Sequence, residues 1–182
     1  MIPAYSGWHV SCCAMDENLQ PRAEKVALGA SIDPAGAEPL VLVRGHSAAV
    51  VYQALATECE HDVAAASDAN HYGWIIFEHP RAVTVGPPSD ESLDGHPLYQ
   101  HGLGPYRAHI VKDSSWPARL EAMEPDYSLG SSDKLRESVH YLLTFQDETF
   151  ECLGTRWTLD GCSQEPIAVI VEEQLPMMIE VE

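Results

Sequence analysis

The sequence predicts an α+β fold: a single domain over residues 1–182, with a mainly antiparallel sheet and two to four helices. The chain has 182 residues, 45% apolar and 21% charged, which is the composition of a globular domain. Residues 139–153 alternate apolar and polar side chains around Gln146–Glu148, a pattern typical of a β-hairpin. Strand-like and helix-like segments are mixed without the regular alternation that a parallel sheet requires.

The N-terminal third contains both kinds of element. Residues 8–14 are predicted to form a strand, and residues 16–30 form a weakly amphipathic stretch in which Pro21 can start a helix. The continuous apolar run 39–44 predicts a strand that is buried on both faces. Ser47 is a typical N-cap for a helix with an apolar stripe at helical spacing, formed by Val51, Leu55, Cys59 and Val63.

Strands dominate the rest of the chain. They are predicted over residues 73–78, 82–85, 106–111, 167–171 and 177–181. Ser115 before Trp116-Pro117 predicts a helix that runs to about Met123, and a second helix start lies near Ser132-Asp133.

Residues 86–105 are predicted to form a long loop, because they contain four glycines and four prolines. Loops of this length inside a domain often carry function. Few apolar residues are available to hold it in place, namely Leu93, Leu98, Tyr99 and Leu103. We therefore expect this loop to be the most mobile internal segment and to border any functional site.

The chain is strongly acidic, with 10 Lys and Arg against 28 Asp and Glu and a net charge of −18. Most of this charge lies in residues 57–99 and 139–182, which hold one basic residue each against eight and nine acidic ones. Specific nucleic-acid binding is therefore not expected, since affinity for nucleic acid comes mostly from Lys and Arg. A basic protein partner or a small cationic molecule would suit this surface better.

Two further features bear on location. The longest apolar runs last only about five residues, whereas a membrane-spanning helix needs ~20, so no membrane association is expected. The five cysteines form no C-x-x-C pair, and residues 1–10 do not read as a signal peptide. Reduced thiols in a cytoplasmic protein are the simplest account.

The candidate site residues are His96 and His101 in the long loop, His109 on the following strand, and His140 and Glu151 on the hairpin. Imidazole and carboxylate groups can bind zinc, but neither H-E-x-x-H nor C-x-x-C spacing is present. Ordinary surface histidines explain the pattern as well. Whether a metal binds is left open, and no cofactor is predicted.

The hairpin also predicts specific pairings. A two-residue turn at Asp147-Glu148 would place Phe145 opposite Phe150 and Thr144 opposite Glu151. His140 would then lie about 14 Å from the Glu151 position, which excludes a direct contact between the two side chains. One face of the hairpin would belong to the core, with Tyr141, Leu143, Phe145, Phe150 and Cys152.

The segment from His140 to Cys152 ends in Asp-Glu-Thr-Phe-Glu-Cys. It resembles a family of uncharacterised bacterial proteins that share a strand with the motif Asp-x-Thr-Phe-Glu-Cys. The resemblance covers about thirteen residues and implies no activity for any of them.

Two functions follow as hypotheses. The leading one is a cytoplasmic, non-catalytic protein that binds a partner through its acidic surface. The alternative is a hydrolase-like enzyme, with or without a metal ion, whose site lies between the 86–105 loop and the 139–153 hairpin. Converging histidines and carboxylates would favour the enzyme. In addition, the apolar run 177–181 can leave a strand edge that pairs between two copies of the chain as a homodimer.

Overall fold

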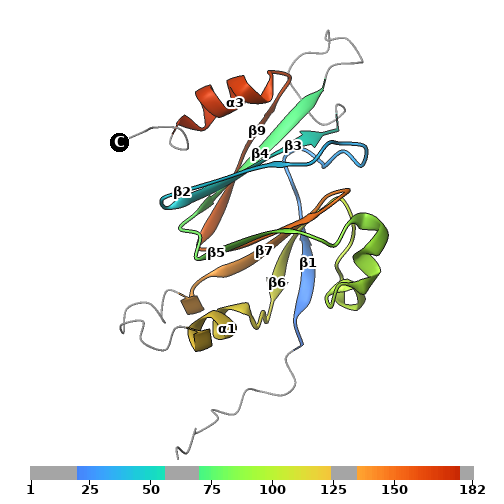
Figure 1. The fold of residues 1–182 in the computed structure, drawn as a ribbon, viewed down its shortest axis with the longest axis vertical. Helices are drawn as coiled ribbons and strands as arrows, with labels where there is room; N and C mark the ends of the chain where they lie inside the picture. Colours follow the sequence, from blue (N-terminus) through green and yellow to red (C-terminus); the bar gives the residue numbers. More distant parts are fainter. Residues whose placement is uncertain (1–19, 56–69, 124–134, 177–182) are drawn as a thin grey trace, which may run out of the picture.

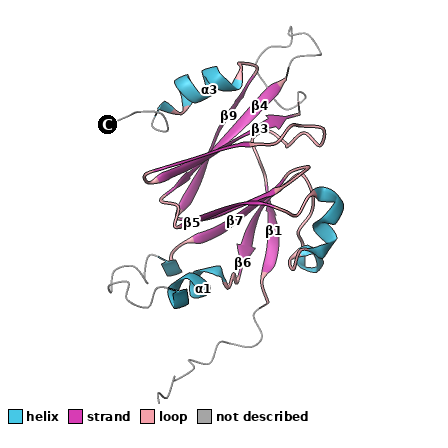
Figure 2. Cartoon of the chain, in the orientation of Figure 1, coloured by secondary structure: helices cyan, strands magenta, loops and turns pink. Residues whose placement is uncertain are grey.

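The computed structural model describes residues 20–55, 70–123 and 135–176, and within them it contains two antiparallel sheets (Figures 1 and 2). The five-stranded sheet has the order β1-β6-β7-β8-β5, formed by Arg22–Val26, Ala108–Lys112, Val139–Thr144, Thr149–Gly154 and Ala82–Gly86. The four-stranded sheet has the order β2-β3-β4-β9, formed by Leu40–Arg44, Ser47–Ala54, His71–Glu78 and Arg156–Ser163.

Helices are a minor part of the described chain. They comprise α1 (Trp116–Met123), α3 (Ile167–Gln174) and two 3₁₀ helices, η2 (Asp90–Gly95) and η3 (Tyr99–His101). The predicted α+β class with antiparallel strands broadly fits this sheet-rich arrangement. The expectation of one sheet is wrong, because the strands divide into two. No helix in the described ranges is long and apolar enough to cross a membrane.

The main core lies between the two sheets. Buried side chains of β3 and β4 pack there against buried side chains of β6, β7 and β8. At its centre the Phe77 ring lies 5.1 Å from that of Phe150 and 5.4 Å from that of Tyr141. The predicted core face of the hairpin is confirmed, since all five of its residues belong to this cluster.

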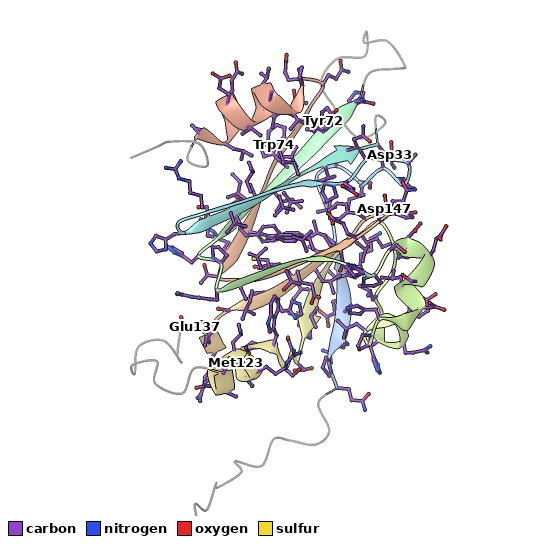
Figure 3. All side chains as sticks on the ribbon, in the orientation of Figure 1. Asp33, Tyr72, Trp74, Met123, Glu137 and Asp147 are labelled. Carbon is purple, nitrogen blue, oxygen red and sulfur yellow. The ribbon has the colours of Figure 1, made fainter. Side chains whose placement is uncertain are left out.

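Each sheet also has a covered outer face (Figure 1). Ile170 and Leu175, on α3 and just after it, pack on the four-stranded sheet, where Figure 3 shows Tyr72 and Trp74 below the helix. The η2–η3 segment covers part of the five-stranded sheet with Leu93, Leu98 and Leu103, which pack against Ala23, Val111 and Leu142. Burying these apolar side chains on both outer faces adds to the main core.

The 86–105 segment is therefore not the weakly held loop that its composition indicates. Leu93, Leu98 and Leu103 are all buried. The N–H of Asp90 donates to the carbonyl of Gln146 at 2.8 Å, and the Tyr106 hydroxyl donates to the Asp90 carboxylate. The segment is held at the hairpin tip and on the outer face of the sheet.

Several element predictions are wrong. Ser47–Ala54 is not the start of a helix but β3, a central strand that pairs with both β2 and β4. Ile167–Gln174 is a helix rather than a strand, and residues 22–26 form a strand rather than a helical stretch. In each case a short run of consecutive apolar residues or a weak pattern fits either element, so periodicity does not separate them. The sequence reading also missed β9.

Other expectations have mixed outcomes. The strand at β2 is confirmed, but it lies at an edge of its sheet and leaves Val43 58% exposed, so burial on both faces is wrong. Cys152 is free and buried, whereas Cys162 is disulfide-bonded, which contradicts the expectation that every thiol is reduced. The predicted strands 8–14 and 177–181, and the helix start near residue 132, lie outside the described residues.

Gly102 sets how closely the η3 segment approaches β1. Its φ is +100°, and a Cβ there would lie 2.4 Å from the carbonyl oxygen of Ala23. We expect Gly102→Ala to lower the free energy of unfolding by about 2 kcal/mol, because both the backbone conformation and the contact oppose a side chain. Urea unfolding measures this. Gly95→Ala is the control, since nothing lies within 4 Å of its Cβ position, and equal losses in both variants would contradict the prediction.

Candidate functional site

The candidate site lies on the outer face of the five-stranded sheet. Because side chains alternate along a strand, the residues next to the core-facing Tyr141 and Cys152 point outward. His140 of β7 and Glu151 of β8 are therefore on the same outer face as Leu142, which packs under the η2–η3 segment. The hairpin forms part of this face and the 86–105 segment packs on it, and these are the two segments between which the sequence predicts the site.

His140 and Glu151 are in direct contact, which corrects the predicted hairpin register. Thr144 pairs with Thr149 and Leu142 with Glu151, and the Phe145 N–H donates to the Glu148 carbonyl at 2.9 Å, so the turn is centred on Gln146-Asp147, one residue earlier than predicted. The shift by two residues makes His140 and Glu151 diagonal neighbours, a separation that long side chains can span. The Nε2 atom of His140 lies 2.7 Å from Oε2 of Glu151. The prediction from the sequence that the side chains of His140 and Glu151 cannot touch is therefore wrong.

Ser114 joins this pair at its other end. Its Oγ lies 2.8 Å from Nδ1 of His140, so a serine, a histidine and a carboxylate form one hydrogen-bonded chain. This chain, Ser114–His140–Glu151, is called the relay below. It connects three separate elements: the β6–α1 turn, β7 and β8.

The position of Ser114 is set by a strand–turn–helix unit. Strand β6 ends at Lys112, Asp113 has a positive φ of 54°, and α1 begins at Trp116. The Trp116 N–H donates to Ser114 Oγ at 3.2 Å, and the Trp116 ring meets the His140 ring edge-on at 4.9 Å between centroids. Both contacts fix the hydroxyl against the imidazole.

The hydrogens of the relay can be placed by donor and acceptor matching. An ionised carboxylate only accepts, so Nε2 of His140 donates its hydrogen to Glu151. In neutral imidazole the other nitrogen then accepts, and the Ser114 O–H donates to Nδ1. This tautomer satisfies both hydrogen bonds in the form of the relay in which the imidazole is neutral.

Two more side chains act on the relay electrostatically. Burial by itself would raise the pKa of Glu151, but the hydrogen bond and charge of His140, with smaller effects of His96 and Arg119, hold this pKa below its usual value. Burial lowers the pKa of His96, an effect that Glu151 opposes and His140 reinforces. His96 and Arg119 thus lie close enough to sense the charges of the relay.

The structure places some of the five candidate residues predicted from the sequence at the relay and others away from it. His140 and Glu151 are in contact, whereas His96 acts on them only electrostatically and its Nδ1 accepts the N–H of Leu98 at 3.1 Å. His109 is on the same sheet face but completely buried, and its Nε2 accepts the N–H of Gly104 at 3.3 Å. His101 is exposed on η3, and no contact connects it with the relay within the described residues.

Sequence reasoning missed Ser114, Trp116 and Arg119 as members of the site. The motif Ser-Ser-Trp-Pro was interpreted only as a helix start. A strand followed by a serine in a turn and then a helix is the context of a nucleophilic serine in some hydrolases, and these elements were predictable here, but Ser114 is not flanked by the glycines of the G-x-S-x-G motif.

Among the described residues, no group of three or more His, Cys, Asp and Glu side chains is arranged to hold a metal ion. The relay contains only two such residues, and hydrogen bonds engage both ring nitrogens of His140.

Comparison with known proteins gave no match to any family model, curated protein or solved structure. The function is therefore inferred from the side chains of the chain itself.

Proposed function

We propose that the protein is a hydrolase of carboxylic esters, in which Ser114 is the nucleophile, His140 the general base and Glu151 the group that orients His140. The observation that carries this proposal is the unbroken relay, with bonds of 2.8 Å and 2.7 Å. It favours the enzyme over the non-catalytic binding protein that was the leading hypothesis. No metal ion takes part in this proposal.

The reaction follows from the hydrogen positions. Ser114 Oγ attacks the ester carbonyl carbon while its proton passes to Nδ1 of His140, and the imidazolium is stabilised by the Glu151 carboxylate. His140 then returns the proton to the leaving alkoxide, the carbon–oxygen bond breaks, and an acyl-serine remains. A water molecule, deprotonated by His140, attacks the acyl-serine and releases the carboxylic acid and free Ser114. The net change is one ester and one water to one acid and one alcohol.

The ring nitrogens are used in the opposite order from serine proteases, where Nε2 faces the serine. The chemistry requires only that one nitrogen accept the hydroxyl proton while the other donates to a carboxylate. His140 meets both conditions, since Ser114 and Glu151 contact opposite sides of the ring. The N-terminal end of α1 adds a partial positive charge beside Ser114.

A fluorophosphonate probe and 4-nitrophenyl hexanoate test the proposal together. We expect the probe to label wild-type protein on Ser114, and Ser114→Ala to lose both labelling and ester hydrolysis. His140→Gln should lower hydrolysis at least ~100-fold, the usual contribution of a positioned base. Both variants are first checked for folding by thermal unfolding.

Ser92→Ala is the matched control, because Ser92 is a serine whose hydroxyl contacts Ser89 rather than a histidine. It should keep full labelling and activity. Absence of labelling in the wild type, or labelling that survives Ser114→Ala, would refute the proposed hydrolase.

Binding of a basic partner is a second candidate function, favoured by one observation. The pKa of Glu148 is raised by burial and by the nearby charges of Glu38 and Asp147, and Figure 3 shows Asp147 at the hairpin tip. A cationic partner would relieve this repulsion. Titration with an oligolysine peptide tests it: we expect binding that weakens with salt and with Glu148→Gln, and no binding at low salt would exclude it.

We also propose, as the sequence predicts, that the protein does not bind nucleic acid specifically and that two copies can pair as a homodimer. The cytoplasmic location that the sequence predicts conflicts with one observation. The disulfide at Cys162 argues against a reducing compartment, since disulfides persist mainly in oxidising ones. Alkylation of thiols in intact cells decides this point: a fully reduced Cys162 supports a cytoplasmic location, and an oxidised one argues against it.

A further inference from the structure

Helix α1 places a second functional side chain beside the relay. Trp116 contacts the His140 ring, and Arg119 follows three residues later, which puts both on the same side of the helix. The positive charge of Arg119 acts on Glu151. The helix spacing therefore places Arg119 on the side of α1 that contacts the relay, and its electrostatic effect on Glu151 agrees with this placement.

Four arginines of the described residues, Arg44, Arg81, Arg107 and Arg119, take part in none of the ion pairs found there, and of these four Arg119 is the one whose charge acts on Glu151. Arg22, Arg136 and Arg156 each form an ion pair, with Glu24, Glu121 and Glu78 respectively. Arg119 is exposed, and within the described residues it forms none of the ion pairs found there. It is a cation with unused hydrogen-bond donors in a protein of net charge −18.

We infer that Arg119 is a specificity-determining residue that binds a carboxylate on the acyl group of the substrate. This inference rests on the proposed hydrolase. A guanidinium holds a carboxylate through two parallel hydrogen bonds, which also fixes the orientation of the acyl chain. Without such a cation, the net charge and the ionised Glu151 would repel an anionic ester.

A pair of esters with equal chain length tests the inference. Mono-4-nitrophenyl adipate carries a terminal carboxylate, whereas 4-nitrophenyl hexanoate ends in a methyl group. We expect wild-type kcat/KM to be at least ~10-fold higher for the adipate, the factor that corresponds to one exposed charge-assisted contact. Rates are corrected for the residual rate in Ser114→Ala.

Arg119→Gln should remove this preference by raising KM for the adipate, with little change for the hexanoate. Arg119→Lys should restore part of it. Arg136→Gln is the control, because it removes the same charge from an exposed side chain that pairs with Glu121, and it should leave the preference intact. High salt should weaken the preference.

The outcomes separate the two proposals. Ser114-dependent hydrolysis of the hexanoate without a preference for the adipate overturns the role of Arg119 and leaves the hydrolase standing. An equal fall in kcat for both esters in Arg119→Gln also overturns it, since Arg119 would then act only through Glu151. If neither ester is hydrolysed in a Ser114-dependent way, both proposals fail.

Discussion

Phe150→Ala is expected to lower the free energy of unfolding by about 3–5 kcal/mol, the usual cost of removing a buried phenylalanine ring. Phe150 is fully buried at the centre of the core between the two sheets, and its ring lies 5.1 Å from that of Phe77. Truncation leaves a cavity that neither sheet can close without breaking its own hydrogen bonds. Urea or guanidinium unfolding at neutral pH measures the loss.

The paired residue on the neighbouring strand supplies the control. Val85 of β5 lies directly opposite Phe150 in the sheet but is 41% exposed, because β5 is an edge strand. We expect Val85→Ala to cost less than ~1 kcal/mol. Phe145→Ala should behave like Phe150→Ala, since Phe145 is also buried and belongs to the same core. A loss below ~1 kcal/mol in Phe150→Ala would show that this face of the hairpin is not the core face.

The hairpin shows which level of structure its sequence determines. Side chains alternate with a period of two, so the assignment of Tyr141 and Phe150 to the core does not depend on the register. The actual register differs from the predicted one by two residues, which keeps every side chain on its face and changes only its neighbours across the sheet. The core was therefore predictable and the contact between His140 and Glu151 was not, because the position of the turn decides the register, and the turn lies one residue earlier than predicted.

The candidate site was also only partly predictable, because some of its residues follow from local sequence patterns and others depend on how distant strands pair. Its place, between the 86–105 segment and the hairpin, followed from a loop rich in glycine and proline next to a clear strand pattern. Ser114 did not, since its contact with His140 spans 26 residues and depends on how β6 pairs with β7. Similarly, β3 and α3 are short apolar segments whose type is decided by tertiary packing rather than by local pattern.

Protonation of His109 is expected to make the protein less stable as the pH falls from 6.5 towards 4. His109 is completely buried, and burial is the main reason why its pKa is lowered to about 4, although the nearby Leu142 backbone acts in the opposite direction. In the unfolded chain its pKa returns to about 6.5, so the unfolded state binds the proton first. Stability is then lost progressively below pH 6.5, and the loss is complete below pH 4.

The difference between these pKa values corresponds to about 3 kcal/mol. Unfolding free energies measured by urea titration from pH 7.5 to 4 should show this fall. His109→Gln should flatten it, because an amide cannot become charged and its oxygen can still accept the Gly104 N–H. His96→Gln is the comparison variant, since the pKa of His96 is also lowered by burial but its side chain is only partly buried. An acid dependence that remains the same in His109→Gln would show that His109 already binds its proton in the folded protein.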